Sequence, residues 1–318
     1  MSILISSIFI LGGLAILIYG ADALVKGASS MATKWRVPSI VIGLTIVAFG
    51  TSAPELVVSL LAAMNGTTDI AIANVVGSNL SNILLILGIS ACIRPLIVKN
   101  STAYKEIPFA ILAMIIVLIV GYDTLLTGAA TNVLTRSDGF IFIAFFIIFL
   151  YYTYGLSKIK GSDEKIDSYS WKKSILLFIA GLVGLIIGGK FIVDNAIILA
   201  TAAGLSETLI GLTIIAIGTS LPELATSIVA AKKGHSDIAI GNIVGSNIFN
   251  VFWILGITAV VTPLPVSAEA QIDALFTTFV SFLLFIALFV GQKQRLTKIE
   301  GSVFLLIYVG YIIYASMR

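Results

Sequence analysis

A long internal repeat limits the folds open to this chain more than any other feature of its sequence. Residues 42–91 align with residues 210–259 at a constant offset of 168 without a gap, and 31 of these 50 positions are identical. The identities include polar runs, because GTSAPE at 50–55 recurs as GTSLPE and NVVGSNLSN at 74–82 recurs as NIVGSNIFN. Chance matching of two apolar segments does not reproduce such runs. The chain therefore consists of two halves with a common plan.

The composition places both halves in a membrane. The 318 residues are 58% hydrophobic and 11% charged, with a mean hydropathy of +1.10, whereas a soluble domain carries about 25% charged residues. In lipid an apolar surface is required. The net charge of +3 is too small to indicate a nucleic-acid partner. Met1–Tyr19 lacks the basic start of a cleaved signal peptide, so we interpret it as membrane helix.

Ten segments are apolar enough to cross a bilayer, which takes ~20 helical residues. They are Ile3–Ala23, Ser39–Met64, Ile70–Ile93, Ile107–Tyr122, Gly139–Leu156, Lys173–Ala200, Leu209–Ala231, Ile238–Val261, Ala274–Val290 and Gly301–Ala315. We expect an all-α, polytopic membrane protein with ten transmembrane helices. The domains are residues 1–156, a first five-helix repeat; 157–172, a cytoplasmic linker; and 173–318, a second repeat. Because five is odd, the second repeat is inverted, as in secondary transporters.

The positive charges predict the orientation. With the N-terminus outside, all but three of the 19 Lys and Arg residues fall on the inner ends and loops, the exceptions being Arg136, Lys190 and Arg318. Basic residues concentrate on the cytoplasmic side of membrane proteins. Both termini are therefore expected outside the plasma (cell inner) membrane.

Two acids fall in the middle of predicted spans. An ionised acid at the bilayer centre costs at least ~2.5 kcal/mol, so Glu55 and Glu223 are expected to face the bundle interior. Pro54 and Pro222 lack an N–H, so the carbonyls of Gly50 and Gly218, four residues back, lose their helical donors. Both spans should therefore break near the midplane, which frees carbonyl groups to bind cations. Nearby polar side chains are Thr51, Ser52, Ser78, Asn79 and Asn82 in the first half, and Thr219, Ser220, Ser246, Asn247 and Asn250 in the second.

Such a set of oxygen donors is typical of a site for a hard cation such as Ca²⁺. One cysteine, Cys92, and one histidine, His235, argue against zinc, copper or iron and exclude an intramolecular disulfide.

The two GTSxPE segments and the two NxxGSNxxN segments resemble the α-repeats of the calcium/cation antiporter superfamily, and most closely those of prokaryotic sodium/calcium exchangers. The resemblance implies that Glu55 and Glu223 are the central metal ligands. It adds the hydroxyl groups of Thr51, Ser52, Thr219, Ser220, Ser78 and Ser246, the amides of Asn82 and Asn250, and the carbonyls of Ala48 and Ala216. Family members often carry Asp at the position of Asn250 or, in some branches, of Asn82. Here both are Asn, which leaves a central charge of −2.

The resemblance also implies the partners. It predicts Ca²⁺ and Na⁺ as transported ions bound at the central site, no cofactor, and a functional monomer in the lipid bilayer. Charge accounting supports exchange, because one Ca²⁺, or two or more Na⁺ or protons, would neutralise the two acids. The predicted function is Na⁺/Ca²⁺ antiport by alternating access, with Ca²⁺/H⁺ or K⁺-dependent exchange as alternatives.

Other interpretations are weaker. Ser52-x-x-Glu55 and Ser220-x-x-Glu223 also fit a capping box, in which the serine caps its own helix. An intramembrane enzyme needs a nucleophile with a base or a His-based metal site, so we expect no enzyme. In a cation channel, two carboxylates would hold a divalent ion too firmly for fast passage. Two pairs with i, i+4 spacing, Asp22/Lys26 and Lys190/Asp194, are expected to be local ion pairs, with a role in gating as the alternative.

Overall fold

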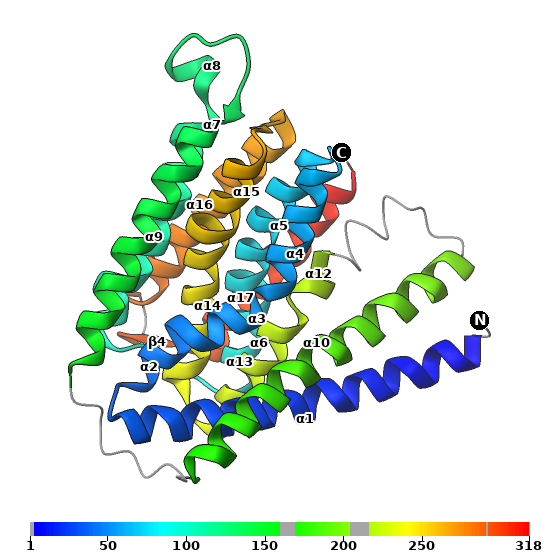
Figure 1. The fold of residues 1–318 in the computed structure, drawn as a ribbon, viewed down its shortest axis with the longest axis vertical. Coiled ribbons are helices and arrows are strands. Elements are labelled where there is room, and N and C mark those ends of the chain that lie inside the picture. The colour runs from blue at the N-terminus through cyan, green and yellow to red at the C-terminus, as the bar shows by residue number, and fades with distance from the viewer. Residues whose placement is uncertain (1–2, 160–168, 204–215, 291, 318) are drawn as a thin grey trace.

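The chain folds into a bundle of long helices from which one helix pair extends at an angle (Figure 1). The computed structural model describes residues 3–159, 169–203, 216–290 and 292–317. Within these residues, eight helices are long and apolar enough to cross a membrane, and a bent pair, Ser39–Thr51 with Ala53–Met64, makes a ninth if it is counted as one span. The fold is thus an all-helical, polytopic membrane fold, as expected. The predicted span Leu209–Ala231 begins outside the described residues.

The elements follow the repeat. The first half contains α1 (Ile3–Trp35), α2 (Ser39–Ile42), the π-helical turn η1 (Gly43–Val47), α3 (Ala48–Thr51), α4 (Ala53–Met64), α5 (Thr68–Ser81), η2 (Asn82–Leu87), α6 (Gly88–Ile93), β1 (Leu96–Ile97), η3 (Thr102–Glu106), α7 (Ile107–Gly121), α8 (Asp123–Leu126), β2 (Val133–Leu134) and α9 (Arg136–Ser157). The second contains α10 (Trp171–Ala202), α12 (Ala216–Thr219), α13 (Leu221–Lys233), α14 (Ser236–Ile248), η5 (Phe249–Leu255), α15 (Gly256–Val261), β3 (Leu264–Pro265), α16 (Ala268–Ala287), β4 (Arg295–Leu296) and α17 (Lys298–Ser316).

Two predicted boundaries are wrong. Helix α1 continues to Trp35, well past the predicted end at Ala23, because its second half also packs along α10. Helix α16 spans Ala268–Ala287 instead of Ala274–Val290. Its polar first turns do not look like a membrane helix, but the Ser267 side chain accepts a hydrogen bond from the Ala270 N–H and starts the helix there.

The predicted helix breaks are confirmed. The chain bends by 44° between α3 and α4, with Ser52 as the one residue between them. Ser52 has φ −83° and ψ 8°, and its counterpart Ser220, between α12 and α13, has φ −84° and ψ 5°. Each serine is followed by a helix with proline in its first turn, where the missing N–H costs no helical hydrogen bond. The same local sequence thus produces the same break twice.

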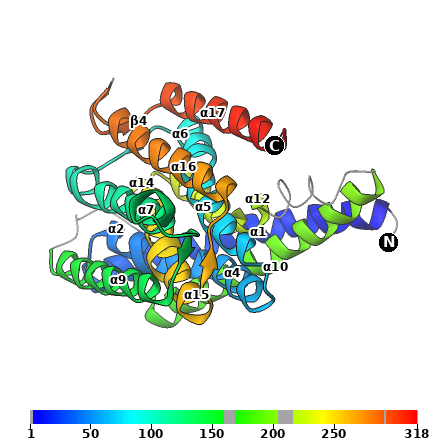
Figure 2. The same ribbon diagram turned by 90° about the horizontal axis from the view of Figure 1, so that it is seen from above.

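The helices with the NxxGSNxxN segments form the centre of the bundle. The span Thr68–Ile93 is 72% buried and Ser236–Val261 is 83% buried, the highest values among the candidate spans in the described parts of the chain. Seen from above, α5 and α14 lie between α9 on one side and α17 on the other (Figure 2). Both pass through π-helical turns, η2 and η5, which begin at or next to Asn82 and Asn250. Such turns frequently mark functional sites.

Two short antiparallel ribbons join the halves. Strand β1 pairs with β4, with Leu96 opposite Leu296, and β2 pairs with β3, with Leu134 opposite Leu264. Each ribbon takes one strand from each half. These two-residue strands are absent from the all-α prediction because their signal lies in tertiary pairing and not in an alternating sequence pattern.

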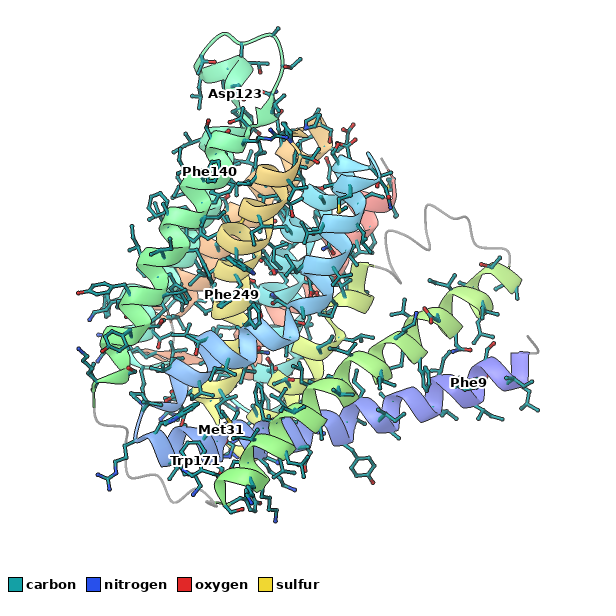
Figure 3. The ribbon with its side chains drawn as sticks, viewed as in Figure 1. Phe9, Met31, Asp123, Phe140, Trp171 and Phe249 are labelled. Carbon is teal, nitrogen blue, oxygen red and sulfur yellow. The ribbon has the colours of Figure 1, made fainter. Side chains whose placement is uncertain are left out.

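Helices α1 and α10 form a separate pair. They run antiparallel in contact along their length, and Met31 and Trp171 lie at one end of the pair while Phe9 lies toward the other (Figure 3). Small residues line the contact at seven-residue intervals, so that Gly13 meets Gly188, Gly20 meets Gly181 and Gly27 meets Ser174. Small residues let membrane helices approach closely. The pair touches the bundle through its own hydrophobic cluster, in which Leu17, Leu24 and Leu185 pack against Val47 and Ala225.

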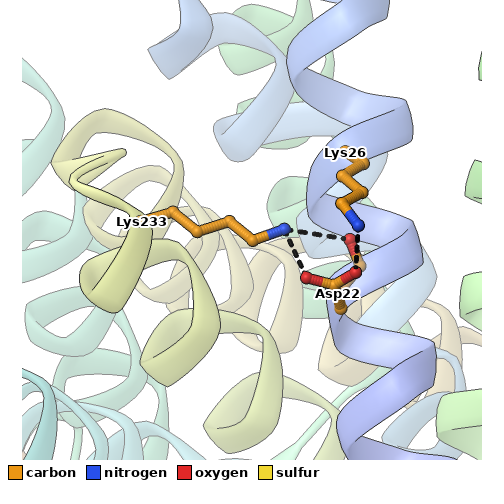
Figure 4. Close-up of polar contacts among 3 residues, drawn as sticks. All are labelled: Asp22, Lys26 and Lys233. Carbon is orange, nitrogen blue, oxygen red and sulfur yellow. Dashed lines mark hydrogen bonds and ion pairs between the residues drawn. The ribbon is translucent and has the colours of Figure 1, made fainter. Parts of the chain in front are cut away.

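Charged side chains add a link to the bundle. The expected local pairs are confirmed, with Lys26 Nζ 2.7 Å from Asp22 Oδ2 and Lys190 Nζ 2.9 Å from Asp194 Oδ2. Asp22 also binds Lys233 at the end of α13, at 2.5 Å (Figure 4). This second ion pair joins residues 211 positions apart, so helical spacing does not predict it. It ties α1 to α13.

The close packing of α1 on α10 gives a first prediction. A Cβ added to Gly181 would lie 2.4 Å from the Leu24 backbone nitrogen, whereas one added to Gly12 of α1 has nothing within 4 Å. Backbone cannot yield as a flexible side chain does, so Gly181→Ala should destabilise the protein by about 1–3 kcal/mol. Thermal unfolding in detergent should show a lower midpoint for Gly181→Ala and an equal or higher one for Gly12→Ala. Equal midpoints for Gly181→Ala and the unsubstituted protein would show that the helices are not in close contact.

Candidate functional site

Two buried acids lie at equivalent places in the two halves. Glu55 is in the first turn of α4 and Glu223 is in the first turn of α13, each three residues after the serine at the helix break. Each is only 1% exposed. The sequence prediction that both acids face the bundle interior is confirmed. A buried carboxylate is costly unless other groups compensate its charge.

Hydroxyl groups cross between the halves to reach these acids. The Ser52 hydroxyl donates to Glu223 Oε1 at 2.9 Å, and the Ser220 hydroxyl donates to Glu55 Oε1 at 3.4 Å. Ser246 also donates to Glu223 Oε1, at 3.3 Å. The serine at each break therefore binds the acid of the other half. Neither serine side chain caps its own helix, so the capping-box interpretation is wrong.

The remaining predicted hydroxyl groups lie around this centre. Ser220 Oγ is 3.4 Å from Ser78 Oγ. Thr51 and Thr219 bind asparagines of the opposite half, since Thr51 Oγ1 donates to Asn242 Oδ1 at 3.0 Å and Thr219 Oγ1 donates to Asn74 Oδ1 at 3.4 Å.

Asn74 and Asn242 are site residues that the sequence prediction did not assign. Asn74 Nδ2 donates to the Glu55 carbonyl at 3.2 Å and to Ser59 Oγ at 3.0 Å. Asn242 Nδ2 donates to the Glu223 carbonyl at 3.4 Å and to Ser227 Oγ at 3.1 Å. Each thus anchors the helix turn that carries an acid. Their identity in both repeats, as the first Asn of each NxxGSNxxN segment, is the signal that could have found them.

Four oxygens at the centre have no hydrogen-bond partner among the described residues. They are Glu55 Oε2, Glu223 Oε2, Asn82 Oδ1 and Asn250 Oδ1. All four residues are 1% exposed, and buried acceptors normally find partners. The set comprises one carboxylate oxygen and one amide oxygen from each half. Carboxylate and amide oxygens are ligands that Ca²⁺ accepts.

The carbonyl ligands are less distinct. The Ala48 carbonyl accepts hydrogen bonds from the Ser52 N–H at 3.0 Å and from Thr51 Oγ1 at 3.3 Å, so it is engaged within its own helix end. Ala216 starts α12, but its contacts lie outside the described part of the chain. A ligand role for these two carbonyls stays a prediction.

The described site contains two carboxylates and otherwise neutral oxygens. No group of three or more His, Cys, Asp or Glu side chains gathers anywhere in the described ranges. Apolar helices that break around two buried acids define a polytopic membrane protein with a buried acidic pair between two related halves.

The family model for the sodium/calcium exchanger protein matches residues 5–155 and 173–317. The chain belongs to this family. It is 38% identical to the putative antiporter CaxA of Alkalimonas amylolytica, over 97% of this chain and 98% of that protein. It is 32% identical to the sodium/calcium exchanger MaX1 of Methanosarcina acetivorans, over 98% of each. Its fold is similar to that of the sodium-calcium exchanger NCX_Mj soaked with Na⁺ and Sr²⁺, with a TM-score of 0.85, 32% identity and full coverage of both chains.

The unpartnered oxygens give a second prediction. Glu55→Gln and Glu223→Gln keep the size and the Oε1 acceptor of each side chain but remove one charge from a site of −2. Each should weaken Ca²⁺ binding about a hundredfold or more, as loss of a buried charge partner does, while the protein stays folded because a desolvated charge is lost. Ca²⁺-dependent thermal stabilisation measures the affinity.

Glu269→Gln is the matched control, because it removes an equal charge from an exposed position in the first turn of α16. Its Ca²⁺ affinity should not change. Equal affinities for Glu223→Gln and Glu269→Gln would show that the buried acids do not bind the ion.

Proposed function

We propose that this protein is a secondary active antiporter that exchanges Na⁺ for Ca²⁺ across the plasma membrane, with Glu55 and Glu223 as the central ligands. The observation that carries the proposal is the pair of buried carboxylates, one from each half, each with one oxygen unpartnered among the described residues. The similarity to exchangers over nearly the full chain supports it. No catalytic residue is assigned, because family members are transporters.

The geometry supports a specific set of ligands. The acids supply the charge of −2, Asn82 and Asn250 supply amide oxygens, and Ser52, Ser220, Ser78 and Ser246 lie within the hydroxyl network around them. Thr51 and Thr219 support the cage through Asn242 and Asn74. Water completes the coordination of a Ca²⁺ ion, which takes 6–8 oxygens.

Charge neutralisation explains why transport is an exchange. One Ca²⁺, or two or more Na⁺, neutralises the two acids. An empty site would carry two uncompensated charges in an apolar environment, which is expensive. The protein therefore switches access from one side of the membrane to the other only when Ca²⁺ or Na⁺ occupies the site. Each Ca²⁺ that moves one way is thus exchanged for Na⁺ that moves the other way.

The α1/α10 pair is suited to move during alternating access. It contacts the bundle through a separate hydrophobic cluster and holds itself together through small residues. The two halves, residues 1–156 and 173–318 with the linker 157–172 between them, are inverted five-helix repeats in this proposal. Each half supplies one mobile helix and one set of ligands.

Transport in proteoliposomes tests the coupling. Vesicles preloaded with Na⁺ should take up ⁴⁵Ca²⁺, and vesicles without Na⁺ should take up little. Low pH should inhibit uptake, because protons compete for Glu55 and Glu223. If a proton gradient alone drives full uptake and Na⁺ adds nothing, the chain is a Ca²⁺/H⁺ exchanger; a requirement for K⁺ would show K⁺-dependent exchange.

Cysteine labelling tests the inverted topology. On a Cys92→Ser background, a cysteine at Asn65 should react from outside and one at Ser101 from inside, with both termini outside. The linker between the halves should be cytoplasmic. Termini on opposite faces of the membrane would rule out two inverted five-helix halves.

A further inference from the structure

Four asparagines connect α5 and η2 with α14 and η5 around the proposed ion site. We call Asn79, Asn82, Asn247 and Asn250 the amide belt; each is at most 5% exposed. Asn82 Nδ2 donates to Asn247 Oδ1 at 2.9 Å, and Asn250 Nδ2 donates to Asn79 Oδ1 at 3.0 Å. Both hydrogen bonds cross from one half to the other, and they are equivalent under the repeat.

The inner pair of the belt is itself fixed in orientation. Asn79 Nδ2 donates to the Asn247 carbonyl at 3.2 Å, and Asn247 Nδ2 donates to the Asn79 carbonyl at 3.4 Å. An amide that donates on one side presents its oxygen on the other. The side chains of Asn79 and Asn247 must therefore offer Oδ1 to Asn250 and Asn82.

This orientation decides which atom the outer pair presents to the site. Since the NH₂ groups of Asn82 and Asn250 are held by the inner pair, their Oδ1 atoms are the ones left without partners in the described structure. If either amide turned over, its oxygen would face another Oδ1 and its NH₂ would face the cation. Both contacts are repulsive.

We propose that Asn79 and Asn247 are positioning residues of the cation site, each holding the ligand amide of the opposite half with its oxygen toward the ion. The inference rests on the proposed function. It also explains why both outer positions are Asn in this chain, since an Asp at position 82 or 250 could not donate to the inner pair. The belt thereby keeps the site at a charge of −2.

A double-mutant cycle separates positioning from simple helix packing. Asn79→Ala and Asn250→Ala should each raise the KM for Ca²⁺ about tenfold with little change in maximal rate. Because Asn79 acts through Asn250, the double variant should be no worse than either single variant. The effects of Asn79→Ala and Asn82→Ala on KM should instead add, to about a hundredfold in the double variant. The reason is that Asn79 orients Asn250, whereas Asn82 is a separate ligand.

The mirror cycle and a conservative variant guard against misfolding. The KM of the double variant Asn247→Ala/Asn82→Ala should be no higher than that of either single variant. The effects of Asn247→Ala and Asn250→Ala on KM should add. Asn79→Asp keeps an oxygen for Asn250 Nδ2 and should raise KM less than Asn79→Ala does. Two results would overturn the proposal: additive effects on KM for the coupled pairs of both cycles, or an equal rise in KM for Asn79→Asp and Asn79→Ala. Either would show that the amide belt contributes only helix packing.

The outcome is distinguishable from failure of the proposed function. If the unsubstituted protein does not exchange Na⁺ for Ca²⁺, the proposed function is wrong, and the same cycles are then measured through Ca²⁺-dependent thermal stabilisation of the purified protein. If Ca²⁺ does not stabilise the unsubstituted protein either, both proposals are overturned.

Discussion

The burial of two carboxylates at one place governs the rest of this structure. Each acid receives a serine hydroxyl from the other half on Oε1, and each Oε2 has no partner among the described residues. Hydrogen bonds from neutral hydroxyls do not offset the cost of desolvating two like charges. A cation bound between the two acids would compensate this cost, which is the physical basis of the proposed site. The helix breaks and the crossing serines hold the two acids in this arrangement.

Much of this could be predicted because one signal, the repeat, appears twice in the sequence. Glu55 and Glu223 stand out as acids within apolar spans, and Pro54 and Pro222 indicate the breaks next to them. What the sequence could not decide was the choice of partners. Ser52 has one acid in its own half and another in the opposite half, and both suit a hydroxyl; only the approach of α3 to α13 selects Glu223. The extent of α1 was missed for the same reason, because its length depends on α10.

The same repeat makes the α1/α10 pair nearly symmetric. Gly13 and Gly20 correspond to Gly181 and Gly188 at the offset of 168, and the two sets of glycines face each other. Because the helices are antiparallel, Gly13 meets Gly188 and Gly20 meets Gly181. The two helices contact each other more extensively than they contact the bundle. The pair is therefore better held together than it is held to the rest of the protein.

Charge breaks this symmetry. Asp22 and Lys190 are equivalent under the repeat, as are Lys26 and Asp194, yet their signs are exchanged. Asp22 is bound to Lys233 of α13, whereas the position equivalent to Lys233 is the neutral Asn65. Lys190 therefore cannot form the equivalent ion pair, because its partner position holds the neutral Asn65. Two inverted halves with identical contacts would give two conformations of equal free energy. The ion pair that ties α1 to α13 must break if α1 moves past α13. It therefore lowers the free energy of the conformation described here relative to the conformation in which the two halves exchange their arrangements.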